Sequence, residues 1–168
     1  MTLLLTSCIH TPAHPPLAGA VHVEAHARVE AADDEGAECR WEEEALWVGA
    51  TRVIGSEPPD AADWCTTPSD HWSTLDILGQ DGRFVSVLGV SDTEAASCST
   101  WDVEAGRPVS LSEYDEKLVD KRLKRAARLL QRLAWTYPVD PEAFYVGGGH
   151  IVFCFFDGAG ARHDLPVP

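Results

Sequence analysis

The sequence predicts an α+β fold, in which an antiparallel sheet carries one long helix packed on one face. Three observations lead to this prediction. Strand-like alternation begins at Val21, a helical pattern runs from Ser110 to about Trp135, and short strand-like segments return after Tyr137. An order of strands, helix and strands is typical of a sheet that a helix covers.

The first two strands are expected to form a hairpin. Apolar and polar residues alternate strictly over 21–30, which is typical of a half-buried strand. The segment "AADDEGAE" supplies turn residues. A second strand then carries an apolar face, interrupted by Glu43, made of Cys39, Trp41, Ala45 and Trp47. Pairing of the two strands could place Arg40, Glu42 and Glu44 across from the His and Arg residues of the first strand.

A long loop over 56–70 separates this hairpin from two further strands, 75–78 and 84–90, which a turn over 79–82 joins. The long helix follows, with Ser110 and Glu113 as a capping box. Its apolar stripe consists of Val119, Leu123, Ala126, Ala127, Leu130, Leu133 and Ala134. Its cations, mostly left to solvent, are Lys117, Lys121, Lys124, Arg128 and Arg132. The segments "AFYVGGGHIVFCFF" and "ARHDLPVP" then predict two short strands and a closing strand or extended tail.

Length and charge limit the classes of function. The chain has 168 residues, which fits one domain, and a formal net charge of -14. Because such a surface repels phosphate backbones and anionic head groups, we expect no nucleic-acid partner.

The N-terminal stretch "LLLTSC" resembles a bacterial lipobox, with Leu5, Thr6 and Ser7 before the lipid-accepting Cys8. We therefore expect a lipobox remnant and Pro-rich tether over 1–18 and a single domain over 19–168. This predicts a lipid-anchored protein of the cell envelope that faces the periplasm or cell surface and reaches the membrane only through its lipid. The apolar segment is shorter than the roughly 7 to 15 residues of a secretory signal, so a frayed terminus of a cytoplasmic protein is the alternative.

Four cysteines remain, Cys39, Cys65, Cys98 and Cys154, without the C-x-x-C spacing of a zinc or redox site. Export would permit two disulfides in any of three pairings. In a reducing cytosol the four would be buried thiols.

The segment "WDVEAGRPVSLSEYD", Trp101 to Asp115, resembles a strip in the C-terminal domain of RsiV-type anti-sigma factors. "FYVGGGHIVFCFF" and "LPVP" are similar to that family's later strands and closing end, so the resemblance covers about 84–168. The segment between Phe156 and Leu165 is shorter than the family's insert, and no Gly-Ala-His stretch precedes Trp101. The resemblance implies an extracytoplasmic domain, largely of unknown function, which in RsiV-type proteins binds lysozyme as a sensor.

No catalytic or cofactor motif stands out. The H-E-x-x-H, G-x-S-x-G, Walker and G-x-G-x-x-G patterns are missing, and "GGGH" is typical of a hairpin turn. His150 with Asp157, or His163 with Asp164, could form a base and its orienter without an assignable nucleophile. His22, Glu24 and His26 share one side of a strand. Adjacent residues on that side lie about 6.6 Å apart along the strand, so a straight strand does not easily bring all three side chains to one metal ion. We therefore expect no cofactor and no metal. The motifs leave open whether the protein is an enzyme, and they favour a protein that is not one.

The sequence thus favours a noncatalytic module that binds a protein or a cell-wall-associated ligand. The candidate ligand surface is the acidic hairpin with Asp33, Asp34, Glu35, Glu42 and Glu44, which suits a basic extracellular protein such as a lysozyme. Two alternatives stay open: a hydrolase acting on cell-wall material, and a cytosolic interaction or immunity-type protein if the lipobox is accidental.

Overall fold

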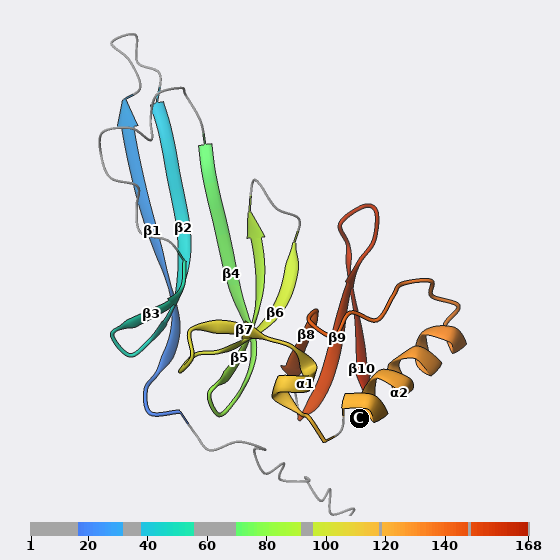
Figure 1. Ribbon diagram of the computed structural model, residues 1–168. Helices are drawn as coiled ribbons and strands as arrows, with labels where there is room; N and C mark the ends of the chain where they lie inside the picture. Colours follow the sequence, from blue (N-terminus) through green and yellow to red (C-terminus); the bar gives the residue numbers. More distant parts are fainter. Residues whose placement is uncertain are drawn as a thin grey trace, which may run out of the picture.

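The computed structural model describes residues 17–31, 38–55, 70–91, 96–117, 119–147 and 149–167. Cys8, Cys65 and the predicted ligand-surface residues Asp33, Asp34 and Glu35 lie outside these ranges, as does most of the predicted tether. The described residues form the strands and helices that Figure 1 labels. They are β1 (Val21–Ala31), β2 (Glu38–Val48), β3 (Thr51–Ile54), β4 (Asp70–Asp81), β5 (Phe84–Ser91), β6 (Ser97–Asp102), β7 (Arg107–Val109), α1 (Leu111–Tyr114), α2 (Val119–Arg132), β8 (Phe144–Gly147), β9 (His150–Phe156) and β10 (Arg162–Val167).

The fold is mostly β, so the predicted α+β class with one long helix is wrong. The described residues contain ten strands, of which β1, β2 and β4 have 11 or 12 residues each. They contain two helices, and α1 has only 4 residues. The sheet is not purely antiparallel either, because β2 and β4 pair in parallel.

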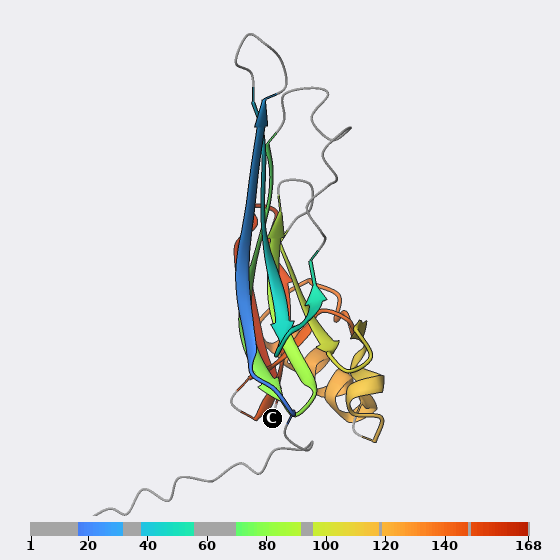
Figure 2. The same cartoon turned by 90° about the vertical axis from the view of Figure 1, so that its left-hand side faces the viewer.

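The strands form two sheets. The larger is a mixed sheet in the order β1-β2-β4-β5-β6-β7, with β3 paired to β2 beside it. The smaller is antiparallel, in the order β10-β9-β8. Figure 1 shows the smaller sheet and both helices at one end of the molecule, and the long strands β1 and β2 of the larger sheet at the other end. In the side view of Figure 2, β1 is the outermost strand.

The main core lies around the smaller sheet and the helices. It contains thirteen buried side chains, among them Phe144 and Phe153 with no exposed surface. From α2 it takes Ala126 and Leu130, while Val119 and Leu123 are partly buried against it. The predicted helical stripe is therefore confirmed at these four positions. It is wrong at three positions: Ala127 is exposed on the outer side of α2, and Leu133 and Ala134 are exposed beyond its end at Arg132.

A chain of hydrogen bonds joins the two sheets inside this core. The Val146 N–H donates to Ser86 Oγ at 3.0 Å, Ser86 and Thr100 hydroxyls lie 2.9 Å apart, and Thr100 Oγ1 donates to the Phe144 carbonyl at 2.8 Å. Nearby, β4 approaches β8 so closely that a Cβ at Gly79 would collide with the Val146 carbonyl oxygen. Every polar atom in this chain has a partner, so the contact between the sheets is specific.

A disulfide between Cys98 on β6 and Cys154 on β9 adds a covalent link between the sheets. Cys39 is also disulfide-bonded. The sequence left the pairing open, because spacing alone cannot choose among three possibilities.

The predicted helix is interrupted after Tyr114. The Tyr114 ring turns into the core and its hydroxyl donates to buried Asp81 at 2.6 Å, which fixes the chain at this point. Asp115 then leaves helical geometry and accepts a hydrogen bond from Arg122 of α2 at 3.2 Å. The predicted capping contact is present, since the Ser110 N–H donates to the Glu113 carboxylate at 2.9 Å. The break follows from tertiary contacts that helical periodicity does not record.

The pairing of β1 with β2 differs from the expected one. His26 lies opposite Glu43, whereas Glu42 and Glu44 lie opposite Ala27 and Ala25. The expectation that Glu42 and Glu44 face His and Arg residues is therefore wrong, because the register differs by one residue and each such step exchanges the two faces.

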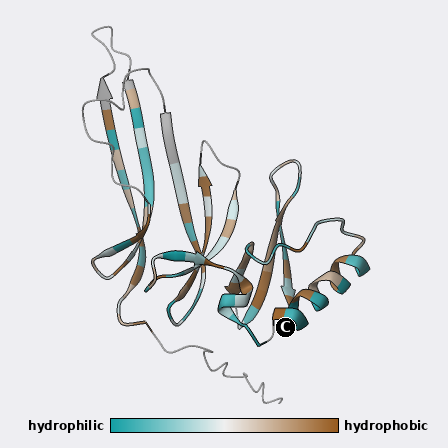
Figure 3. Ribbon diagram, in the orientation of Figure 1, coloured by the Kyte–Doolittle hydropathy of each residue, from teal (hydrophilic) through white to brown (hydrophobic). Residues whose placement is uncertain are grey.

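The β1–β2 end of the molecule is less hydrophobic than the β9 end. Figure 3 shows mixed hydropathy along β1 and β2 and continuous hydrophobic colour along much of β9. Val21 and Val23 are packed against a second, smaller core that includes Leu46, Val85, Val87 and Val103. Ala25, Ala27 and Val29 farther along β1 are exposed. The alternation of β1 thus predicts burial correctly only over its first residues.

Candidate functional site

A depression of about 320 Å³ lies across β1, β2 and β4. Because β2 pairs antiparallel with β1 and parallel with β4, three segments distant in sequence meet there. Its lining residues are Ala25, His26, Ala27, Glu42, Glu43, Glu44, Ser73 and Thr74. The depression combines small side chains, carboxylates and hydroxyl groups, which is a surface suited to a cationic group with an apolar stem.

The register explains why space is left at this point. Ala27 lies opposite Glu42 and Ala25 opposite Glu44, so two methyl groups face two longer side chains. Residues directly opposite in an antiparallel pair project from the same face, which places both glutamates beside the small alanines. The two alanines therefore make room for a ligand group between the carboxylates.

The two glutamates differ in their own contacts. Glu44 Oε2 accepts the backbone N–H of Leu75 at 2.7 Å and is thereby held in place where β2 and β4 separate. Glu42 is more than half exposed, and its Oε1 lies 3.9 Å from Arg40 Nε. An exposed ion pair at this long distance is weak. Glu42 is thus the more available carboxylate, and Glu44 is the more rigid one.

The lining of the depression includes residues from both faces of these strands, because Glu43 and His26 project from the face opposite to Glu42 and Glu44, as does Trp47. Glu43 is 8% exposed and has a further interaction within the chain. The His26 and Trp47 rings lie 6.1 Å apart, and His26 Nε2 and Trp47 Nε1 are buried with no hydrogen-bond partner among the residues that the structure describes. Within the described ranges, no group of three His, Cys, Asp or Glu side chains could hold a metal ion. His22, Glu24 and His26 are therefore not brought together as ligands.

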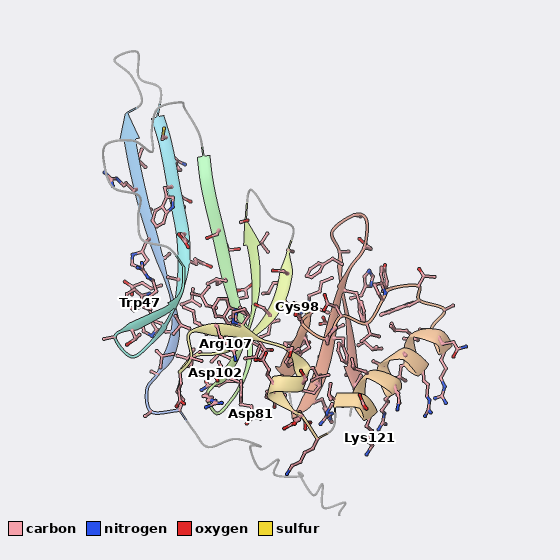
Figure 4. All side chains as sticks on the ribbon, viewed as in Figure 1. Trp47, Asp81, Cys98, Asp102, Arg107 and Lys121 are labelled. Atoms are coloured by element: carbon pink, nitrogen blue, oxygen red, sulfur yellow. A yellow bond between two sulfur atoms is a disulfide. The ribbon has the colours of Figure 1, made fainter. Side chains whose placement is uncertain are left out.

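The strip that carries the family resemblance is used for folding. Asp102, buried at 6% exposure, accepts the N–H groups of Glu104 and Ala105 and lies 3.1 Å from Arg83. These contacts shape the turn between β6 and β7. Figure 4 labels Asp81 and Asp102, which lie in the region where the larger sheet meets α1.

The rest of the strip holds the start of α1. Arg107 Nη2 lies 2.7 Å from Glu113, and this ion pair, together with the Ser110 N–H, lowers the pKa of Glu113 to about 2. Burial first, and then the Asp81 carboxylate, raise the pKa of the Tyr114 hydroxyl. Each of these side chains contacts other residues of the same chain, so the strip stabilises the fold.

The structure brings together His163 and Asp157, a pair that the sequence did not propose. His163 Nε2 lies 3.0 Å from the Asp157 carboxylate, which also accepts the N–H groups of Ala159 and Ala161. These contacts, His163 foremost, hold the pKa of Asp157 below its usual value. Asp164 instead accepts from Tyr145 and pairs with Arg162. The His163–Asp157 contact closes the turn between β9 and β10, and the nearby Cys154 thiol is consumed by its disulfide.

Comparisons with known proteins identify a related fold. No protein-family model and no curated protein matches the sequence. Among solved structures, the chain is similar to a DUF3298 family protein from Pseudomonas aeruginosa, with 10% identity, a TM-score of 0.50 and coverage of 89% of this chain and 90% of that one. A DUF3298 family member from Bacteroides fragilis matches at 13% identity and a TM-score of 0.44, over 89% and 91% of the two chains.

At such low identity the likeness shows the fold alone. The first of these structures therefore places the chain's fold beside that of a DUF3298 family protein, across most of the chain rather than only over 84–168. The RsiV-type assignment drawn from the strip is not established by it. No described helix has the length and apolar composition needed to cross a membrane.

Sequence reasoning found Glu42 and Glu44 but missed the rest of the depression. Ser73 and Thr74 reach it through the parallel pairing of β2 with β4, and no local pattern indicates that pairing. Ala25 and Ala27 offered a signal, since alanine at alternate positions of a strand leaves little bulk on that face. The site offers carboxylates and hydroxyl groups, which can bind a cationic group of a ligand.

Proposed function

We propose that this chain is a noncatalytic binding module of the cell envelope that captures a cationic protein at the depression between Glu42 and Glu44. The observation that carries the proposal is the depression itself, where two carboxylates flank two alanines. A Lys or Arg side chain fits such a surface, because its aliphatic stem can cover the alanines while its charged end meets a carboxylate.

The charge of the whole chain supports a basic partner. With a net charge of -14, the protein attracts cationic proteins over a distance of about one Debye length, roughly 8 Å at physiological salt. This attraction accelerates association more than it strengthens the final complex. A basic lysozyme is the probe of choice, because the RsiV-like strip implies such a partner.

Two features support a location in the cell envelope. A disulfide links β6 and β9, and disulfides persist mainly outside reducing compartments. The segment Leu5 to Cys8 resembles a lipobox. We therefore propose attachment to the envelope through a lipid on Cys8. Replacing Cys8 with Ser behind a complete signal should move the protein from the membrane fraction to the soluble fraction, and retention in the membrane fraction would show that Cys8 is not the anchor.

Binding is tested by titrating the purified protein with a basic lysozyme and, in parallel, with an acidic protein of similar size. We expect saturable binding of the basic protein alone, with an association rate that falls as salt rises. Glu42→Gln should weaken binding about two- to fivefold, the range of one exposed charge pair. Glu44→Gln should act similarly, because the Gln carbonyl can still accept the Leu75 N–H.

The matched control is Glu116→Gln, which removes the same charge at an exposed position between α1 and α2. It should leave the affinity unchanged. Equal losses for Glu42→Gln and Glu116→Gln would mean that only net charge matters, and the assignment to the depression would be wrong. Degradation of wall fragments by the purified protein would instead favour the hydrolase alternative.

A further inference from the structure

The outer edge of β1 is long and regular, and no described strand pairs with it. All eleven residues of β1 pair with β2 without a register shift, and β2 is its only strand neighbour in the part of the chain that the structure describes. Figure 2 shows β1 as the outermost strand. Edge strands usually carry a bulge, a proline or charged side chains, lysine above all, that block further pairing. β1 has no bulge, proline or lysine, and its charged residues include Glu24 and Arg28, which have opposite charges. The edge of β1 that faces away from β2 can therefore pair with another strand.

One hydrogen bond determines which residues face that edge. The Gly49 N–H donates to the Ala20 carbonyl at 2.9 Å, so residue 20 belongs to the pairs that are hydrogen-bonded to β2. Hydrogen-bonded and non-hydrogen-bonded pairs alternate along an antiparallel ladder. The even-numbered residues of β1 therefore bond to β2, and the odd-numbered ones direct their N–H and C=O groups outward. Val23, Ala25, Ala27 and Val29 present the free edge.

We propose that β1 pairs antiparallel with β1 of a second copy of this chain, with His26 on the two-fold axis. This register uses all eleven residues and pairs Ala25 of one protomer with Ala27 of the other, and Val23 with Val29, as hydrogen-bonded pairs. Glu24 of each protomer then faces Arg28 of the other at a non-hydrogen-bonded pair, where side chains are closest. The sequence "VHVEAHARVEA" is thus complementary to itself when reversed.

Neighbouring registers lack this complementarity. A shift by two residues in one direction places Glu24 opposite His26, and a shift in the other direction places Glu24 opposite Glu30. Among these three registers, opposite charges of Glu24 and Arg28 meet only in the proposed one, and like charges directly opposite each other are unfavourable. The net charge of -14 opposes any self-association, but screening at physiological salt confines that repulsion to about 8 Å.

The dimer would have consequences for the depression, because Ala25 and Ala27 line it and also form the central pairs. The two depressions would lie next to each other across the two-fold axis. The inference is nevertheless independent of the proposed function, since it concerns the edge of β1 and not its face. Oligomeric state and lysozyme titration report on the two separately.

Sedimentation analysis over a range of protein concentrations tests the proposal. The wild-type chain should show a reversible monomer–dimer equilibrium. Ala27→Pro should abolish the dimer yet keep the circular dichroism spectrum, because proline is tolerated where the N–H of an edge strand points outward. A wild-type chain that stays monomeric at its highest soluble concentration, or an Ala27→Pro dimer of undiminished affinity, would overturn the proposal.

Charge exchange and cross-linking test the register. Glu24→Arg and Arg28→Glu should each weaken the dimer, and the double variant should restore it. Arg28 also has an interaction within its own chain, so the thermal melting of each variant is compared with that of the wild type. His26→Cys should form an inter-chain disulfide on oxidation and Ala25→Cys should not. Efficient cross-linking of Ala25→Cys, or no restoration by the double variant, would show that this register is wrong.

Discussion

The two halves of the molecule use similar strand patterns for different purposes. Among the described residues, all but four of the buried apolar side chains belong to 84–167, and the four exceptions are Cys39, Trp41, Ala45 and Leu46. The half comprising 84–167 carries the disulfide between the sheets and the Ser86–Thr100 hydrogen bonds. The half comprising 17–81 carries the depression and the edge of β1 with which no described strand pairs.

The difference shows that the residues that carry the family resemblance make contacts within the chain. The strip from Trp101 to Asp115 is occupied by turns, caps and ion pairs within the chain. Exposed Glu42, partly buried Glu44 and an edge with which no described strand pairs lie instead on β1 and β2. Under the proposed function, 84–167 is the scaffold and the β1–β2–β4 surface is the interaction surface.

The largest expected effect is on the core of the scaffold half. Phe153 has no exposed surface and packs in the main core, so Phe153→Ala should lower the free energy of unfolding by about 3 to 5 kcal/mol. Ile77 of the other half is 41% exposed, and Ile77→Ala should cost about 1 kcal/mol or less. Chemical denaturation measures both. Similar losses at the two sites would remove the contrast between the halves.

Loss of the disulfide should come next. It closes a sequence separation of 56 residues, so the paired variant Cys98→Ala with Cys154→Ala should lose about 2 to 4 kcal/mol. Thermal unfolding under oxidising conditions measures the loss while leaving the Cys39 disulfide in place. A paired variant as stable as the wild type would mean that the hydrogen bonds and apolar contacts between the sheets suffice.

The hydrogen bonds between the sheets should contribute less. Ser86→Ala leaves the buried Val146 N–H without its acceptor and should cost about 1 to 3 kcal/mol. Thr100→Val leaves the Phe144 carbonyl without its donor and should cost a similar amount. Because both residues belong to one network, the double variant should cost less than the sum. Strict additivity in a double-mutant cycle would show that the two bonds act independently.

The smallest effect concerns the exposed Arg107–Glu113 pair. The pKa of Glu113 is lowered from 4.5 to about 2, chiefly by the hydrogen bond from Arg107. A lowered carboxyl pKa contributes stability above pH 4.5, and this contribution is lost as pH falls towards 2. Side-chain NMR titration should show the low pKa of Glu113, and Arg107→Met should raise it. An unchanged pKa in the variant would assign the shift to the Ser110 N–H instead.

The sequence predicted the features that depend on local periodicity. Strands around Val21, Cys39, Phe84 and Phe153 and the buried residues Ala126 and Leu130 lie where the patterns place them. What it missed depends on contacts between distant segments. The parallel pairing of β2 with β4 and the helix break at Tyr114 leave no local signal, since Tyr114 is held by Asp81, 33 residues earlier. The one-residue difference in the β1–β2 register changed which residues line the site.

Amide chemical-shift mapping during titration with a basic lysozyme tests the central claim most directly, because it locates the bound surface residue by residue. We expect saturable changes concentrated at Ala25 to Ala27, Glu42 to Glu44, and Ser73 and Thr74, with β8, β9 and β10 unaffected. Changes centred on α2 or on β9 and β10, or no saturable change at all, would contradict the assignment of binding to the β1–β2–β4 surface.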